Sequence, residues 1–204
     1  MVCVKEPIAS DDSQASLVIS DLGLRRIDIF CRINQQAALH VQSILEEIRK
    51  KGVSNGKEKK VTVVVNTQGG EAMQGLAIYD LLRSSGFRIR TIALGEVASS
   101  GLAVALAGHE RLMHKNSILH FHQTATEFGK GEPIKVLRQE EVERERAQTR
   151  TVDALYAKIT LENSRISLRQ LKALEQREAH VTAEQALKMG LVHKLIEHFE
   201  LQTP

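Results

Sequence analysis

The sequence predicts an α/β fold of stacked β-α-β units with one long protruding helix. Three observations predict this class. Short apolar runs rich in β-branched residues alternate with helical segments between residues 61 and 108, as in a parallel sheet covered on both faces. Glycine-containing turns separate these runs. A long segment dense in charges of both signs then follows, which is typical of an exposed helix.

Length and composition limit the domain count and the kinds of partner. The 204 residues suit one domain at 25–204, preceded by a flexible N-terminal segment at 1–24. Hydrophobic residues make up 42% of the chain and aromatic residues only 3%, so the core must be aliphatic. A net charge of +3, from 28 basic and 25 acidic residues, is too balanced to indicate nucleic acid or a membrane surface as a partner.

Cysteine usage and the N-terminus favour a cytoplasmic location. The two cysteines, Cys3 and Cys31, are too few for a disulfide framework, which indicates a reducing compartment. Residues 1–14 carry acidic and polar side chains where a signal peptide would need a continuous apolar segment. Because no apolar run approaches membrane-spanning length, we expect a soluble protein.

The first elements follow from hydrophobic periodicity. Short strands are expected at 17–20 and 26–33, the second because charged and apolar residues alternate. Apolar residues keep three-and-four spacing over 35–50, and basic residues gather at the end of this stretch, which predicts a helix. The basic, glycine-containing stretch at 50–60 is expected to be a solvated loop.

The central and C-terminal elements are predicted in the same way. The β-α-β-α series is expected at 61–65, 72–83, 88–94 and from Gly101, with further strands at 112–113 and 118–122. The charged helix is expected at 132–162, with Leu155, Ile159 and Leu161 as its packing face, and a short helix at 167–176. A capping box beginning at Thr182 starts the last helix, which Gly190 ends.

Two adjacent serines lie where the strand at 88–94 turns into the apolar helix. A hydroxyl at a helix N-terminus is close to unpaired N–H groups that favour a developing anion, which suits a nucleophile. Serine is also a good helix cap, so these residues alone leave both roles open for Ser99 and Ser100.

Four motifs occur in a fixed order along the chain. They are the turn Gly69-Gly70 with the helix GLAIYD at 75–80, the loop GEVASSG at 95–101, the segment from Asn116-Ser117 to His122-Gln123, and the tail TAEQALKMGLV at 182–192. This ordered set resembles the ClpP family, the proteolytic subunits of the ATP-dependent Clp protease, over about residues 58–197. The resemblance implies a ClpP/crotonase-like fold in a divergent member.

The resemblance also implies a serine endopeptidase, with residue roles set by register. Ser99 matches the nucleophile, and the backbone N–H of Ser100 would contribute to the oxyanion hole. Gly70 would supply the second N–H, since a residue without Cβ lets backbone approach the substrate, and Gly69 belongs to the same turn. His122 matches the general base, although His120 would point to the same side of a strand.

The third member of the triad is where the sequence departs from the family. Glu178 stands where the family usually has Asp, and a glutamate can orient a histidine in the same way. Glu175 is the nearby alternative, and His180 replaces an aromatic residue of the family. Gln123, which follows the proposed base, is expected to contribute to substrate binding.

Partners are likewise implied by the resemblance. We expect a homo-oligomer of stacked rings, heptameric by resemblance, in which the long helix interlocks two rings and the substrates are unfolded proteins or peptides. No metal or organic cofactor is required. An AAA+ unfoldase of the Clp type is implied, although residues 1–34, which include the family's docking elements, match poorly. The turn at 67–70 also lacks the family's proline.

Two other functions fit part of these observations. A non-catalytic ClpP-like ring subunit would keep the fold without the chemistry. A crotonase-type acyl-CoA enzyme would direct two backbone N–H groups at a thioester oxyanion. The presence of Ser99 together with His122 argues against the first and is not needed by the second.

Overall fold

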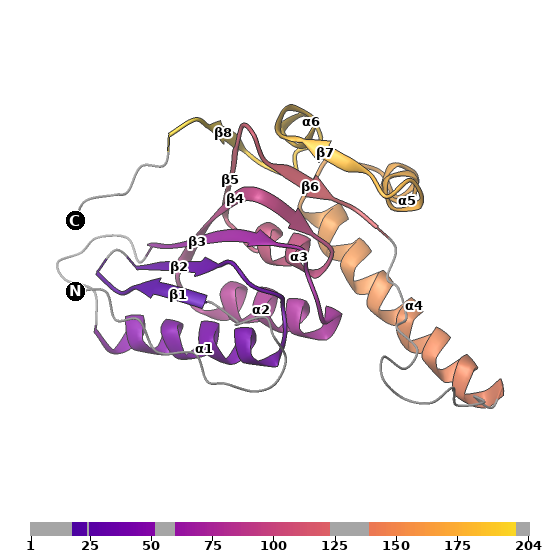
Figure 1. The fold of residues 1–204 in the computed structure, drawn as a ribbon, viewed down its shortest axis with the longest axis horizontal. Helices are drawn as coiled ribbons and strands as arrows, with labels where there is room; N and C mark the ends of the chain where they lie inside the picture. Colours follow the sequence, from indigo (N-terminus) through magenta and orange to yellow (C-terminus); the bar gives the residue numbers. More distant parts are fainter. Residues whose placement is uncertain (1–17, 24, 52–59, 123–138, 199–204) are drawn as a thin grey trace.

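The structure is a computed structural model that describes residues 18–23, 25–51, 60–122 and 139–198 (Figure 1). The strands are β1 (Val18–Asp21), β2 (Arg26–Ile29), β3 (Lys60–Thr67), β4 (Arg88–Ala98), β5 (Glu110–His114), β6 (Ile118–His120), β7 (His180–Thr182) and β8 (Lys194–Ile196). The helices are α1 (Gln35–Lys50), α2 (Ala72–Ser84), α3 (Ser100–Leu106), α4 (Gln139–Glu162), α5 (Leu168–Gln176) and α6 (Ala183–Lys188).

The strands form one mixed sheet that forks at β4. The main path runs β1-β2-β3-β4-β5-β8, while β6 pairs with β4 and β7 pairs with β6. β4 pairs with β5 through residues 90–93 and with β6 through residues 96–98, both parallel. β1–β2 and β6–β7 are the antiparallel pairs. The later half of β4 therefore leads into a separate branch made of β6 and β7.

The main core lies between the sheet and the first three helices, which Figure 1 shows on one side of β1–β4. Alternate residues of β3 face this core, among them Val63 and Val65, both fully buried. Val64 points to the opposite face, where it forms a smaller cluster with Ile92 and Leu112. The sequence predicted helices on both faces of the sheet. In the described ranges the main core lies on one face, and the other face carries only this small apolar cluster.

Local sequence signals explain the helix ends. The Asn34 side chain accepts a hydrogen bond from the N–H of Ala37 at 2.9 Å, so α1 begins where its N-cap lies. The capping box at Thr182 is present, with both reciprocal hydrogen bonds to Gln185. Gly190 follows the end of α6 with φ +71°, the conformation that glycine adopts at little cost. The capping box and the terminating Gly190 were predicted and are confirmed, whereas the Asn34 cap was not predicted.

The strand ends were predicted less accurately than the helix ends. β2 and β6 stop at Ile29 and His120, earlier than the expected 26–33 and 118–122. β4 continues to Ala98, beyond the expected end at residue 94, because its last residues pair with β6. β1 lies inside the segment expected at 1–24 and pairs with β2.

The long helix α4 extends away from the body of the molecule (Figure 1). Of its expected packing face, Ile159 is buried and Leu161 is half-buried. Leu155 is 42% exposed, so it does not pack against the rest of the single chain. No helix in the described residues is long and apolar enough to cross a membrane.

Candidate active site

An open cleft of about 1840 Å³ contains most of the side chains singled out in the sequence. The Gly69-Gly70 turn, Ser99, Ser100 and His122 all line it, together with residues of α4 and α5. These groups come from distant parts of the chain. Their convergence on one cleft is the kind of arrangement expected of an enzyme site.

Ser99 lies at the junction of β4 and α3 in a strained backbone conformation. Its φ and ψ are +53° and −126°, values that a residue with a Cβ rarely adopts. The cost of such a conformation is about 1–3 kcal/mol, and it recurs at functional sites, including the strand-to-helix turn that presents a nucleophilic serine. The Ser99 side chain makes no capping hydrogen bond to α3, so the alternative role as a helix cap is not observed.

Ser100 differs from its neighbour in accessibility. It is 3% exposed, and its Oγ is buried without a hydrogen-bond partner in the described part of the chain. A substrate carbonyl could not reach this hydroxyl. Its backbone N–H, in contrast, belongs to the first turn of α3, where no intrahelical acceptor exists.

The Gly69-Gly70 turn is held against Ser99 by backbone and side-chain hydrogen bonds. The N–H of Gly69 donates to Thr67 Oγ1 at 3.0 Å, and its carbonyl accepts from Ile33 N at 2.8 Å. At Gly70 a Cβ would collide with the Ile33 carbonyl. Among the described residues no hydrogen bond uses the N–H of Gly70, so this donor is available to a ligand.

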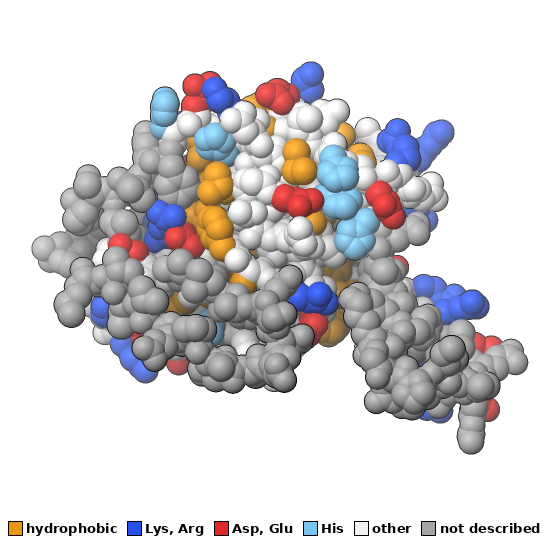
Figure 2. Space-filling view, in the orientation of Figure 1, with side chains coloured by type: hydrophobic (Ala, Val, Ile, Leu, Met, Phe, Trp, Pro, Cys, Tyr) orange, Lys and Arg blue, Asp and Glu red, His pale blue; other side chains and the backbone are white. Residues whose placement is uncertain are grey.

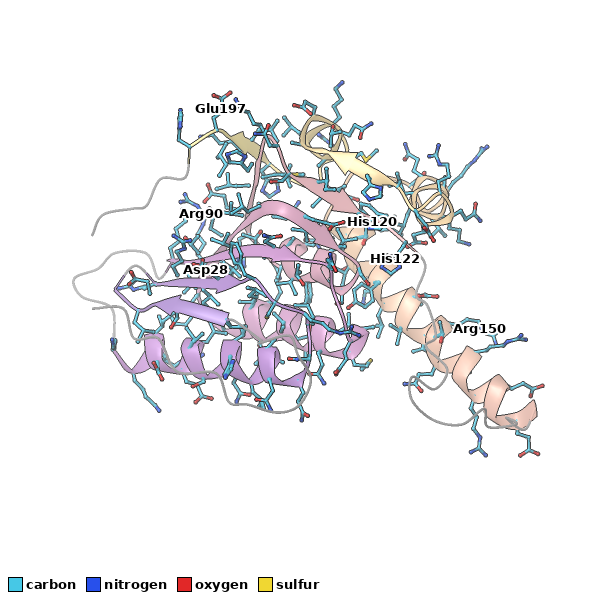
Figure 3. The ribbon with its side chains drawn as sticks, in the orientation of Figure 1. Asp28, Arg90, His120, His122, Arg150 and Glu197 are labelled. Carbon is cyan, nitrogen blue, oxygen red and sulfur yellow. The ribbon has the colours of Figure 1, made fainter. Side chains whose placement is uncertain are left out.

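The two histidines of the β6 segment lie together. Figure 3 shows His120 and His122 at the end of this strand, and their ring centroids are 5.5 Å apart, as expected for alternate residues on one face. Ser99 is tied to the same strand, since its N–H donates to the His120 carbonyl at 3.3 Å. Burial lowers the pKa of His120, and so do His180 and His122. Figure 2 shows a patch of histidine side chains with acidic side chains on both sides of it.

The two candidate acids occupy different positions. His120 pairs with His180 in the antiparallel β6–β7 ladder, and the N–H of Phe121 donates to Ala179 O at 2.9 Å. If this register continued past the ends of β6 and β7, it would bring Glu178 opposite His122. Glu178 is exposed and has φ +47°, one of three non-glycine residues with positive φ among those described.

Glu175 lines the cleft, whereas Glu178 is not among the lining residues. Burial raises the pKa of Glu175, and the nearby Asp153 raises it further, with Lys172 opposing. Such a carboxyl holds its negative charge less readily than an exposed one. Gln123 lies outside the described residues.

The packing of Tyr156 and Gly75 beneath the two serines was not predicted from the sequence. Tyr156 of α4 donates a hydrogen bond to Ala72 O at 2.7 Å, and its burial raises the pKa of the phenol. A Cβ on Gly75 would lie 2.5 Å from the Tyr156 hydroxyl and 2.7 Å from Ser100 Cβ. α2, α3 and α4 therefore meet directly under the serine loop. The signal in the sequence was Gly75 inside a helix, which often marks close packing.

The chain matches the family model described as Clp protease over residues 10–199. A curated relative from Deinococcus radiodurans, an ATP-dependent Clp protease proteolytic subunit, is 28% identical over 86% of this chain and 87% of its own length. The proteolytic subunit 1 of Corynebacterium glutamicum is 28% identical over 71% of this chain and 68% of its own.

Two solved structures share the fold. ClpP1 from Listeria monocytogenes is 25% identical with a TM-score of 0.66, covering 88% of this chain and 95% of that one. A point mutant of the same protein is 22% identical with a TM-score of 0.73, covering 87% and 94%.

Proposed function

The chain belongs to the Clp protease family, and on that premise we propose that it is a serine endopeptidase with Ser99 as nucleophile. One observation carries the proposal. Ser99 occupies a strained strand-to-helix turn on the wall of the cleft that His122 also lines, whereas the hydroxyl of Ser100 is buried. This difference in accessibility supports Ser99, rather than Ser100, as the group that attacks a bound carbonyl.

His122 is the proposed general base. It takes the proton from Ser99 as the hydroxyl attacks, and returns it to the leaving amine. The parallel register of β4 and β6, which pairs Ala98 with His120, supports this role because it brings the end of one strand beside the other. His120 is the weaker candidate, since it is absent from the lining of the cleft.

Glu178 is the proposed acid that orients His122. The β6–β7 register, which would bring Glu178 opposite His122 if it continued past His120 and His180, supports this role. Glu175 is the alternative because it lines the cleft, but the raised pKa of its carboxyl disfavours the charged form that stabilises an imidazolium.

The backbone N–H groups of Gly70 and Ser100 are the proposed oxyanion donors. Neither is used by a hydrogen bond within the described part of the chain. Fixed N–H donors of this kind stabilise the tetrahedral intermediate without reorganising during the reaction. An extended peptide would lie beside the Gly69-Gly70 turn, because main-chain pairing accepts many sequences.

We also propose a homo-oligomer of stacked, heptameric rings that encloses the cleft, with cytoplasmic location and an AAA+ unfoldase of the Clp type as partner. The exposed Leu155 on the protruding α4 supports an interface there. The names of the two curated relatives, each a proteolytic subunit of an ATP-dependent protease, support the unfoldase.

A fluorophosphonate probe tests the nucleophile, because it labels an activated serine. We expect one labelled residue, Ser99, found by peptide mass spectrometry. Labelling should be lost in Ser99→Ala and strongly reduced in His122→Ala, with peptide hydrolysis falling by about 10⁵-fold in the first. Ser100→Ala is the matched control and should keep its labelling.

Labelling at Ser100, or at no serine in the assembled protein, would contradict the proposal. The second result would favour the non-catalytic ring subunit.

A further inference from the structure

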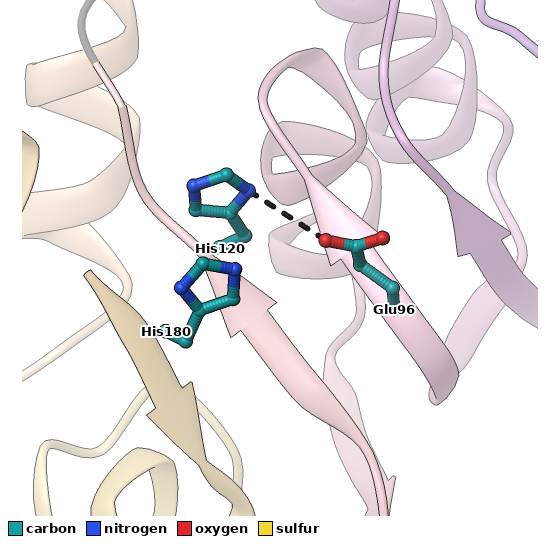
Figure 4. A group of neighbouring side chains, drawn as sticks. All are labelled: Glu96, His120 and His180. Atoms are coloured by element: carbon teal, nitrogen blue, oxygen red, sulfur yellow. Dashed lines mark ion pairs between the residues drawn. The ribbon is translucent and has the colours of Figure 1, made fainter. Parts of the chain in front are cut away.

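Three side chains outside the proposed triad converge from neighbouring strands. Glu96 of β4, His120 of β6 and His180 of β7 lie together in Figure 4. Ala98 pairs with His120, and His120 pairs with His180. Since alternate strand residues share a face, Glu96 lies on the same face as both histidines. The three groups are thus placed by the sheet itself rather than by a loop.

Their geometry suits a single cation. One ligand atom from each side chain can be chosen so that all three lie within 4.8 Å of one another. Around a tetrahedral Zn²⁺, with metal–ligand bonds of about 2.0–2.2 Å, ligand atoms are about 3.4 Å apart. Small side-chain rotations close this difference, and the exposed His180 has room for them.

The ring nitrogens of His120 make no hydrogen bond within this cluster. His120 Nε2 is buried and has no hydrogen-bond partner in the described ranges. Its Nδ1 lies 3.6 Å from Glu96 Oε1, an ion-pair distance too long for a hydrogen bond, and the rings of His120 and His180 stack at 4.1 Å. Nδ1 therefore faces the Glu96 carboxylate without a hydrogen bond between them, so both atoms can bind a cation placed between them.

We propose that Glu96, His120 and His180 bind one divalent first-row transition-metal cation, with Zn²⁺ the best fit. Two imidazole nitrogens and one carboxylate oxygen are a common zinc donor set, which leaves a position for water. Mg²⁺ and Ca²⁺ prefer oxygen ligands alone. The site would lie beside His122, whose ring is 5.5 Å from that of His120, and it uses none of the three side chains of the proposed triad.

Metal titration of the untagged full-length Ser99→Ala variant tests this site. Using that variant separates the metal site from the proposed peptidase, since binding must persist without activity. Co²⁺ added to chelator-treated protein should give visible absorption bands that saturate at one equivalent per chain, and Zn²⁺ should displace it. A chromophoric chelator then gives the zinc affinity.

Glu96→Gln and His180→Asn should each weaken zinc binding by about tenfold or more, since each removes a ligand. These positions are half-buried and exposed, so the variants should keep the parent's circular dichroism and assembly mass. His198→Asn, an exposed histidine elsewhere, is the matched control and should bind as the parent does. An absence of saturable binding, or equal affinity in all three variants, would overturn the proposal.

Discussion

A Cβ on Gly69 would lie 2.6 Å from the Cβ of Ser99, and only 2.8 Å from the carbonyl of Ala98. The glycine turn and the proposed nucleophile are therefore in direct contact, although they are far apart in the sequence. Gly69 also has φ +91°, which disfavours any residue with a side chain. Space and backbone conformation both require glycine here.

Gly69→Ala should lower peptide hydrolysis by about 100-fold or more, because a shift of about 1 Å in a reacting group has that effect. Steady-state kinetics on the assembled protein checks this. Gly86→Ala is the matched control: φ is +76°, but a Cβ there meets no atom within 4 Å. It should lose stability by about 1–2 kcal/mol and keep its turnover. Equal kinetic losses in the two variants would show that contact with Ser99 is unimportant.

Glu178→Gln should lower turnover by about 10³–10⁴-fold with little change in substrate affinity, because an amide cannot stabilise the imidazolium of His122. Glu175→Gln is the comparison and should change turnover by only a few-fold, since burial raises the pKa of that carboxyl. Measured kcat values for both variants decide between the acids. The reverse ranking would assign the role to Glu175.

Glu110 should stabilise the fold less at acidic pH. Hydrogen bonds from Arg90, with Lys60 also contributing, lower the pKa of Glu110 from 4.5 to about 2. Because the folded-state pKa is the lower one, this stabilisation is present above pH 4.5 and is lost as the pH falls toward 2. Glu110→Gln should therefore lower Tm at neutral pH, and the difference from the parent should shrink across that window.

Thermal unfolding at several pH values measures this effect. Glu162→Gln is the control, because Glu162 pairs with Lys158 at 3.9 Å on an exposed surface and should barely alter Tm. A Tm difference for Glu110→Gln that is independent of pH would contradict the assignment.

Ser100→Ala should leave stability unchanged or raise it by up to about 1 kcal/mol, since it removes a buried hydroxyl without a partner. Ser85→Ala is the matched contrast. The Ser85 hydroxyl is also buried, but it donates to Leu82 O at 2.7 Å and accepts from Phe87 N at 3.2 Å. Its loss should cost about 1–2 kcal/mol in urea unfolding. Equal losses in the free energy of unfolding would mean that the Ser100 hydroxyl has a hydrogen-bond partner in the assembled protein.

Helices were predictable because their signals are local. α1 occupies the expected residues 35–50, since an apolar stripe and the Asn34 cap both lie within or beside it. Strand ends depend on partners. Gly95 looked like the end of a strand, but residues 96–98 pair with β6, which no nearby signal announces.

In the candidate site, too, local features were predictable and features that depend on strand pairing or packing were not. Strand alternation predicted that His120 and His122 share a face, and their rings are close. Which serine is accessible depends on packing against Gly75, and the proposed role of Glu178 depends on the β6–β7 register. The cluster of Glu96 with His180 was missed for that reason, because three strands must pair before it exists.

The fork in β4 has a mechanical consequence. Residues 90–93 anchor β5 and the rigid interior, while residues 96–98 carry the branch that bears the imidazoles. The buried side chains of Val97, Leu119 and Val181 pack this branch into the main core. Ser99 directly follows residues 96–98, and its N–H donates to the His120 carbonyl at 3.3 Å, so the proposed nucleophile and base are carried by the same pair of strands and would shift together.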